Sequence, residues 1–111
     1  NSERNISVSL PTESHVEQWL TQLGETDEAM AQATAEYSAA KENIKVQKAI
    51  ATPSSGTSIE RERAALTSAL YKLALEKLRE AEYQKMLLSL KRRQWELGID
   101  VWRSLNANMR H

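Results

Sequence analysis

The placement of proline constrains the fold of this sequence more than any other feature. The 111 residues include two prolines, Pro11 and Pro53, and proline interrupts a helix because it lacks a backbone N–H and clashes with the preceding turn. The two stretches that follow them are rich in Ala, Glu, Gln and Lys, which favour helix. We therefore predict an all-α fold in which two long antiparallel helices, over residues 11–51 and 58–106, form a helical hairpin within a single domain.

The segments outside these helices carry turn signals. Residues 52–57 combine proline, serine and glycine and are predicted to form the loop of the hairpin. Thr57 followed by Glu60 is the pattern of a capping box, which starts the second helix. Residues 1–9 are expected to form a flexible arm. Gly24 is a weak point of the first helix, which we expect to bend or break there because glycine disfavours helix.

Apolar residues recur every seven positions in the first helix, with a second lane three residues on. This heptad spacing is typical of a coiled-coil seam. Thr26 and Gln47 are polar exceptions in the second lane. The apolar members are Val16, Trp19, Leu23, Met30, Ala33, Tyr37, Ala40, Ile44 and Ala51.

The second helix carries two apolar sets on different sides. The first set is spaced by three, four and seven residues and is predicted to face the first helix. It consists of Leu66, Leu70, Leu73, Ala74, Leu78, Ala81, Leu88, Trp95, Ile99, Trp102 and Leu105. The second apolar set consists of Tyr83, Met86, Leu87, Leu90, Leu97 and Val101.

One partner helix cannot cover both sets, and a two-helix hairpin has little interior of its own. We therefore expect a homo-oligomer in which the second apolar set forms the contact between subunits. In the alternative, the first helix folds back after Gly24 and a third helix covers the second set within one chain.

The sequence offers little for catalysis. It has no cysteine, and His15 and His111 lack the spacing of metal ligands. No glycine-rich phosphate cradle and no histidine placed as a base for a serine are present. We expect no enzyme activity, no cofactor, no metal and no small-molecule substrate. The sequence has no apolar run that would cross a bilayer, and the polar residues Asn1 to Asn5 lead us to expect no signal peptide. We therefore expect a cytoplasmic protein without a membrane partner.

Charge is distributed unevenly although the net charge is zero. Residues 1–51 carry four basic and eight acidic side chains, whereas residues 72–111 carry nine basic and five acidic ones. Local cationic surfaces can bind phosphates without regard to sequence, and repetition of such a surface in an oligomer adds weak contacts together.

Two groups of cations are candidates for contact with single-stranded DNA. The loop-side cluster, which we prefer because it lies away from the second apolar set, comprises Lys41, Lys45, Lys48, Arg61 and Arg63. The second candidate is Lys91, Arg92 and Arg93. The alternative interpretation is that the cations of both clusters lie on solvated helix faces. In this interpretation Trp95 and Trp102 are packing residues.

The layout resembles that of phage recombination mediators of the UvsY type. Ile44-Lys45-Val46-Gln47-Lys48-Ala49-Ile50-Ala51 would be the basic end of a first helix, Ser54-Ser55-Gly56 the loop, and an apolar second helix would follow. The family's Lys-Ala-Arg-Leu stretch falls on residues 48–51, where Lys48 matches and Ile50 replaces the arginine. The ending Val101-Trp102-Arg103-Ser104-Leu105-Asn106-Ala107-Asn108 is also similar to that of small helical phage proteins.

The resemblance implies an oligomeric protein that binds single-stranded DNA and assists the loading of a RecA-like recombinase in place of a single-strand-binding protein. Such a protein of a phage or prophage acts in the cytoplasm of the bacterial host. The alternative is a structural protein of the phage scaffold or tail-assembly type, which shares long helices and oligomerisation and does not bind nucleic acid.

Overall fold

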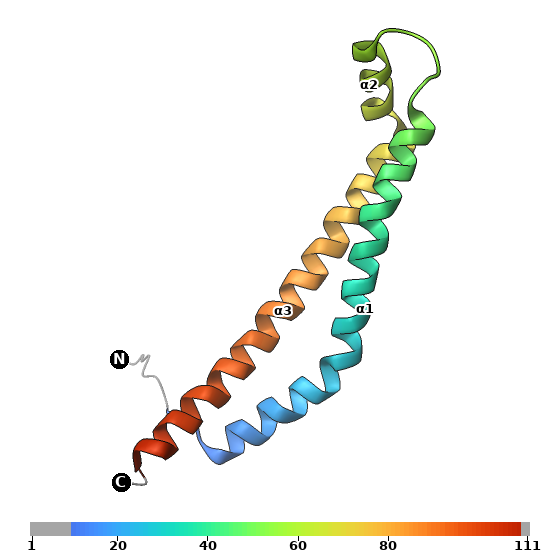
Figure 1. The fold of residues 1–111 in the computed structure, drawn as a ribbon. Helices are drawn as coiled ribbons and strands as arrows, with labels where there is room; N and C mark the ends of the chain where they lie inside the picture. Colours follow the sequence, from blue (N-terminus) through green and yellow to red (C-terminus); the bar gives the residue numbers. More distant parts are fainter. Residues whose placement is uncertain (1–9, 110–111) are drawn as a thin grey trace, which may run out of the picture. The chain divides into compact units, whose positions relative to one another are not determined.

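The computed structural model describes residues 10–109, and helices account for nearly all of them (Figure 1). The helices are α1 (Glu13–Ala51), α2 (Ser58–Thr67) and α3 (Ala69–Met109). The described part of the chain contains no strand, which confirms the all-α class. The expected arm over residues 1–9 lies outside the described residues.

Thr12 caps the start of α1. Its hydroxyl oxygen accepts a hydrogen bond from the backbone N–H of His15 at 3.3 Å, and its own N–H donates to His15 Nδ1 at 3.1 Å. A histidine thus takes the place that glutamate has in a capping box. Pro11 precedes the cap, so α1 begins two residues later than the sequence predicts. The helix then continues through Gly24 without a break.

The predicted capping box at the start of α2 is confirmed. The backbone N–H of Glu60 donates to Thr57 Oγ1 at 3.1 Å, and the backbone N–H of Thr57 donates to Glu60 Oε1 at 2.9 Å. Gly56, with φ of 106°, supplies the left-handed backbone that leads the loop into this cap.

The second predicted helix is interrupted at Ser68, which the sequence pattern did not indicate. Ser68 adopts extended backbone, with ψ of 136°, and separates α2 from α3. Its N–H donates to the carbonyl of Ala65, and its hydroxyl accepts from the N–H of Tyr71 at 3.4 Å. One serine therefore ends α2 and caps α3, because its short side chain can satisfy the free backbone groups of a helix start.

Contacts divide the described residues into two units. Unit 1 combines residues up to Asp27 with those from Ser89 onward, and unit 2 spans Glu28–Leu88. Each unit pairs a part of α1 with a part of α3, and the two parts run antiparallel. In unit 1 this follows because Trp19 lies against Gly98 and Asp27 contacts Arg92, and in unit 2 because Tyr37 contacts Lys85 and Lys48 lies near Tyr71.

The buried and half-buried positions of α1 agree with the heptad seam that the sequence predicts. Val16 is buried and the remaining apolar seam residues are half-buried, as are the polar exceptions Thr26 and Gln47. Positions between the lanes, such as Leu20 and Val46, are exposed. The spacing along α1 therefore identified correctly the face that packs.

The predicted inner set of the second helix is wrong in its first part. Leu66, Leu70 and Leu73 are exposed. Ala74, also a member of the predicted set, is buried as expected. The other inward positions of α2 and the start of α3 are Ala65, Ser68, Tyr71 and Leu75, which the predicted set did not include. The small residues Ala65, Ser68 and Ala74 allow the helices to approach closely. From Leu78 onward the predicted residues are half-buried or buried, as expected, and they share their face with Lys85 and Arg92.

Candidate functional site

The structure brings the two halves of the loop-side cluster together within unit 2. Lys48 Nζ, near the end of α1, lies 3.0 Å from the Glu62 carboxylate of α2. The hydrogen bond and the opposite charge of Glu62 raise the pKa of Lys48 above its ordinary value of 10.5. The pair therefore joins the helices on either side of the loop, and Lys48 is already matched by a carboxylate.

Arg61 is also engaged within the chain. Its Nε donates to the carbonyl of Pro53 at 2.8 Å and holds the loop against the first turn of α2. The contact orders the guanidinium but leaves its charge uncompensated, because a carbonyl carries no net charge. Arg61 therefore remains a positive centre fixed beside the loop.

The other three cations of the cluster are exposed. Lys45 approaches Glu42 at 3.4 Å, with 72% of its side chain exposed, and such surface pairs contribute little and are readily exchanged. Lys41 and Arg63 form no ion pair within the described residues. These three side chains are available to an external anion.

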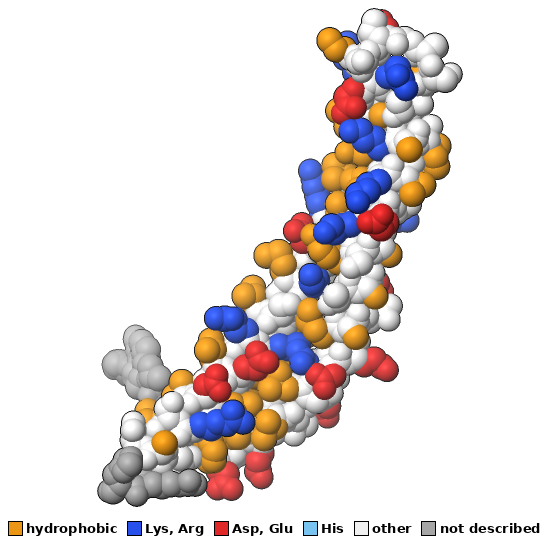
Figure 2. Space-filling model, viewed as in Figure 1, with side chains coloured by type: hydrophobic (Ala, Val, Ile, Leu, Met, Phe, Trp, Pro, Cys, Tyr) orange, Lys and Arg blue, Asp and Glu red, His pale blue; other side chains and the backbone are white. Residues whose placement is uncertain are grey.

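Unit 2 carries a local excess of positive charge beside the loop. Residues 41–72 include three carboxylates, and each has a partner: Glu60 belongs to the capping box, Glu42 contacts Lys45 and Glu62 contacts Lys48. The cations of this segment are Lys41, Lys45, Lys48, Arg61, Arg63 and Lys72. In Figure 2, blue cationic and orange hydrophobic side chains alternate over α2 and the neighbouring turns.

Tyr37 and Lys85 join this region although the sequence pattern did not single them out as site residues. Lys41 Nζ lies 5.2 Å from the centre of the Tyr37 ring, and Lys85 Nζ lies 4.7 Å from it. Both contacts are within the range of cation–π attraction. The sequence did contain a signal, because Lys85 falls seven residues after Leu78 and seven before Arg92, on the inward face of α3. A lysine at a seam position breaks the apolar pattern.

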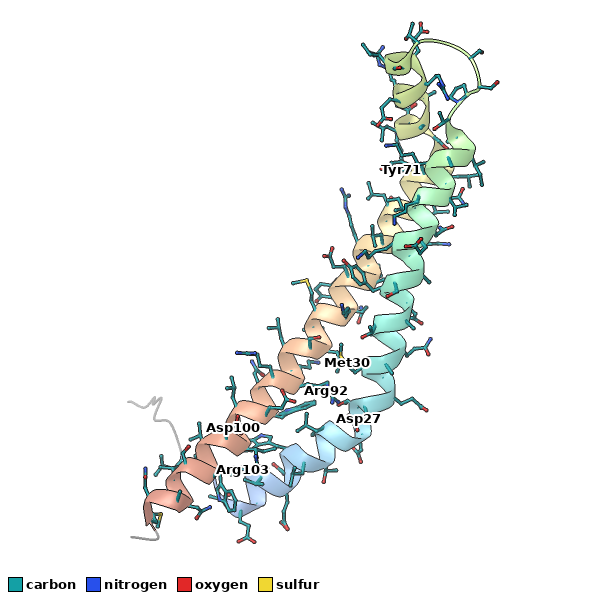
Figure 3. All side chains as sticks on the ribbon, viewed as in Figure 1. Asp27, Met30, Tyr71, Arg92, Asp100 and Arg103 are labelled. Atoms are coloured by element: carbon teal, nitrogen blue, oxygen red, sulfur yellow. The ribbon has the colours of Figure 1, made fainter. Side chains whose placement is uncertain are left out.

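The second candidate cluster is divided by the packing of unit 1. Arg92 points toward Asp27 (Figure 3), and its guanidinium donates to the Asp27 carboxylate at 2.7 Å, to Thr26 Oγ1 at 2.7 Å and to the Leu23 carbonyl at 2.9 Å. Its side chain is 19% exposed. Arg92 therefore links α3 to α1, whereas Lys91 and Arg93 are exposed.

The second apolar set lies largely on the surface of the single chain. In unit 2, Tyr83 and Met86 are exposed and Leu87 is half-buried; in unit 1, Leu90, Leu97 and Val101 are exposed. No third helix covers these residues within the described chain. The alternative in which the first helix folds back is therefore wrong, because α1 remains continuous past Gly24.

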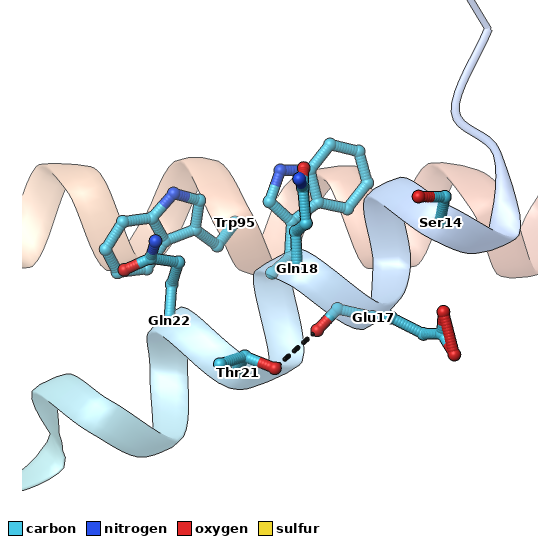
Figure 4. Close-up of a pocket in the computed structure, with 7 residues that line it drawn as sticks. Ser14, Glu17, Gln18, Thr21, Gln22 and Trp95 are labelled. Atoms are coloured by element: carbon cyan, nitrogen blue, oxygen red, sulfur yellow. Dashed lines mark hydrogen bonds between the residues drawn. The ribbon is translucent and has the colours of Figure 1, made fainter.

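A shallow groove of about 470 Å³ lies on unit 1 (Figure 4). Its walls include the Trp19 and Trp95 rings and the amides of Gln18 and Gln22. Glu17 lies at its edge, and its carbonyl accepts a hydrogen bond from Thr21 at 2.8 Å. The tryptophans occupy seam positions, which supports their expected role in packing, and the nearby carboxylate disfavours a polyanion.

Residues 10–109 contain no group of His, Asp and Glu side chains that would hold a metal ion. None of the three helices is apolar over a length sufficient to cross a bilayer. Comparisons with models of protein families, with curated proteins and with solved structures find no match.

Proposed function

We propose that the protein binds the phosphate backbone of single-stranded DNA, without regard to sequence, as a homo-oligomer. The observation that carries this proposal is the charge excess of residues 41–72, where six cations stand against three carboxylates and where Lys41, Arg61, Arg63 and Lys72 form no ion pair with a described residue. Cations of this kind bind phosphates by releasing condensed counterions.

Exposed apolar side chains beside these cations favour a single strand over a duplex. Val46, Ile50, Ile59 and Leu70 are exposed in the same segment. A single strand exposes the faces of its bases, which an apolar surface can remove from water, whereas the bases of a duplex are stacked inside it. The resemblance in layout to UvsY-type mediators supports the finer proposal that the bound strand is passed to a RecA-like recombinase in the cytoplasm of a bacterial host.

Binding to a labelled single-stranded oligonucleotide, measured by fluorescence anisotropy at two salt concentrations beside a duplex of the same sequence, tests the proposal. The double variant Lys45→Gln/Arg63→Gln should weaken binding and reduce its dependence on salt by about 0.7 in the log–log slope for each phosphate that it no longer neutralises. Arg103→Gln is the control, because Arg103 is exposed and lies beside Asp100 in unit 1. Absence of binding by the unmodified protein at low salt would refute the proposal.

A second candidate function is a purely structural role in assembly. It is favoured by the exposure of Tyr83 and Met86 in unit 2 and of Leu90, Leu97 and Val101 in unit 1, since soluble chains generally cover apolar residues that lie close together. Light scattering should report an oligomer, which Leu97→Gln should weaken while Glu96→Gln does not. An oligomer that fails to bind the oligonucleotide would establish the structural role, and a monomer would contradict both functions as proposed.

A further inference from the structure

Two lysines from different helices meet at one tyrosine in unit 2. Lys41 belongs to α1 and Lys85 to α3, and both ammonium groups lie over the ring of Tyr37, at 5.2 and 4.7 Å from its centre. Two positive charges that share one small site repel each other. The attraction of the ring offsets part of this cost, and a bound anion would offset the rest.

The carboxylates in the neighbouring turns do not supply that anion. Glu36 accepts a hydrogen bond from Gln32 at 3.0 Å, and Glu42 contacts Lys45. Neither these two nor Glu82, one turn before Lys85, forms an ion pair with Lys41 or Lys85 among the residues that the structure describes. The positive charge at Tyr37 is therefore uncompensated among residues 10–109.

The position of Lys85 makes this arrangement costly for the fold. Lys85 is half-buried on the inward face of α3, at the heptad position that Leu78 and Ile99 also occupy. An apolar side chain there would strengthen the pairing of α1 with α3. Arg92 is a cation at the same heptad position, but the Asp27 carboxylate of α1 pairs with it, whereas no carboxylate of the described residues pairs with Lys85. Breaks of the local packing rules occur mainly where a site needs them, so an unmatched charge at this position favours a binding role.

We propose that Tyr37, Lys41 and Lys85, the Tyr37 cluster, form an anion site that takes a phosphodiester group of the bound strand. The ammonium groups of Lys41 and Lys85 lie 5.2 and 4.7 Å from the centre of the Tyr37 ring, so α1 and α3 place two charged donors beside one phenol, and an ammonium group is a charge-assisted donor to phosphate oxygens. The inference rests on the proposed function for the source of the phosphate, and it adds Tyr37 and Lys85 to the surface that the loop-side cluster defines.

The variants Lys41→Met and Lys85→Met test the site, because methionine keeps an unbranched apolar side chain and removes the charge. Each should weaken binding of a labelled oligothymidylate about tenfold, as expected for the loss of a charge-assisted hydrogen bond, and lower the salt slope by about 0.7. Lys85→Arg should retain binding. Lys77→Met, a change of the same kind at an exposed lysine of α3, is the control and should bind as the unmodified protein does.

Thermal unfolding separates the site from a role in packing. Lys85→Met should raise the midpoint of unfolding, because an apolar side chain then fills the seam, while it weakens binding. If Lys41→Met and Lys85→Met bind the oligothymidylate as tightly as Lys77→Met, and Lys45→Gln/Arg63→Gln binds weakly, the Tyr37 cluster is not a phosphate site although the proposed function stands.

A titration with inorganic phosphate, followed by the NMR signals of the lysine ε-methylene groups at constant ionic strength, tests the site without DNA. The signals of Lys41 and Lys85 should shift more than that of Lys77. Such shifts in a protein that does not bind the oligothymidylate would support an anion site for free phosphate and refute the proposed function. If the lysine signals do not shift and the oligothymidylate does not bind, both the Tyr37 cluster as an anion site and the proposed function are refuted.

Discussion

The indole ring of Trp19 rests on the backbone of α3 at Gly98. A Cβ atom placed on Gly98 would lie 2.7 Å from two carbons of this ring, which is closer than van der Waals contact permits. The ring of His15 stacks with the same indole, and the two ring centres lie 5.6 Å apart. The absence of a side chain at position 98 therefore sets how closely α1 and α3 approach within unit 1.

Gly98→Ala should destabilise the protein by about 1–2 kcal/mol, because overpacking outweighs the gain of about 1 kcal/mol in helix propensity. Gly24→Ala is the matched control. A Cβ there meets no atom within 4 Å, so the propensity gain alone should stabilise the protein by about 1 kcal/mol. Urea unfolding measures the change in the free energy of unfolding for both variants. Equal effects at the two positions would show that Trp19 does not press on Gly98.

Arg92→Ala should lower the free energy of unfolding by about 1–3 kcal/mol, since it removes three hydrogen bonds between α3 and α1 that a largely covered guanidinium donates. The neighbouring variant Arg93→Ala removes the same charge from an exposed position and should change it by less than about 0.5 kcal/mol. Chemical denaturation followed by circular dichroism measures the difference. Similar losses in the two variants would contradict the structural role of Arg92.

Thr57→Ala should destabilise α2 by about 1 kcal/mol, because it removes the hydroxyl that accepts the N–H of Glu60. Ser58→Ala changes the next residue, which is exposed, and should be nearly neutral. Amide exchange of α2 reports the local effect. Unaltered exchange in Thr57→Ala would mean that the cap does not hold this helix.

The Lys48–Glu62 pair predicts a dependence of stability on alkaline pH. Because the folded state raises the pKa of Lys48 above 10.5, the pair stabilises the fold below that pH, and the contribution is lost as the pH rises through the folded pKa. Glu62→Gln should therefore lower the midpoint of urea unfolding slightly at neutral pH and have no such effect well above pH 10.5. Glu82→Gln, at a carboxylate outside this pair, is the control and should not show this pattern.

The sequence predicted the packing face of α1 because one face alone carries apolar residues at heptad spacing. One of its two polar exceptions has a physical account, since Thr26 at the seam accepts a hydrogen bond from Arg92 of α3. The sequence alone does not predict that Thr26 and Arg92 contact each other. The register between helices depends on contacts across the chain, which spacing within one helix does not encode.

The sequence misplaced the inner face at Leu66, Leu70 and Leu73, although not at Ala74, because that segment is apolar on more than one side. Leucines at positions 66, 70 and 73 suggested the inward face, but Ser68 ends α2 and resets the phase of the following helix. Serine occurs in helix interiors as well as at caps, so its role was not evident without the backbone. The sequence pattern did not indicate the Tyr37 cluster, because its residues belong to two helices and the spacing within one helix does not relate them.

The helix end at Ser68 interrupts the backbone hydrogen bonding between α2 and α3 within unit 2. A ten-residue helix is too short to persist alone in water, so the order of α2 depends on the cap at Thr57, the buried Ala65 and the Lys48–Glu62 pair. Residues 52–67 can therefore open as one local unfolding step while α3 keeps its hydrogen bonds. Limited proteolysis should begin in this segment, and a strand bound across α1 and α2 should protect it.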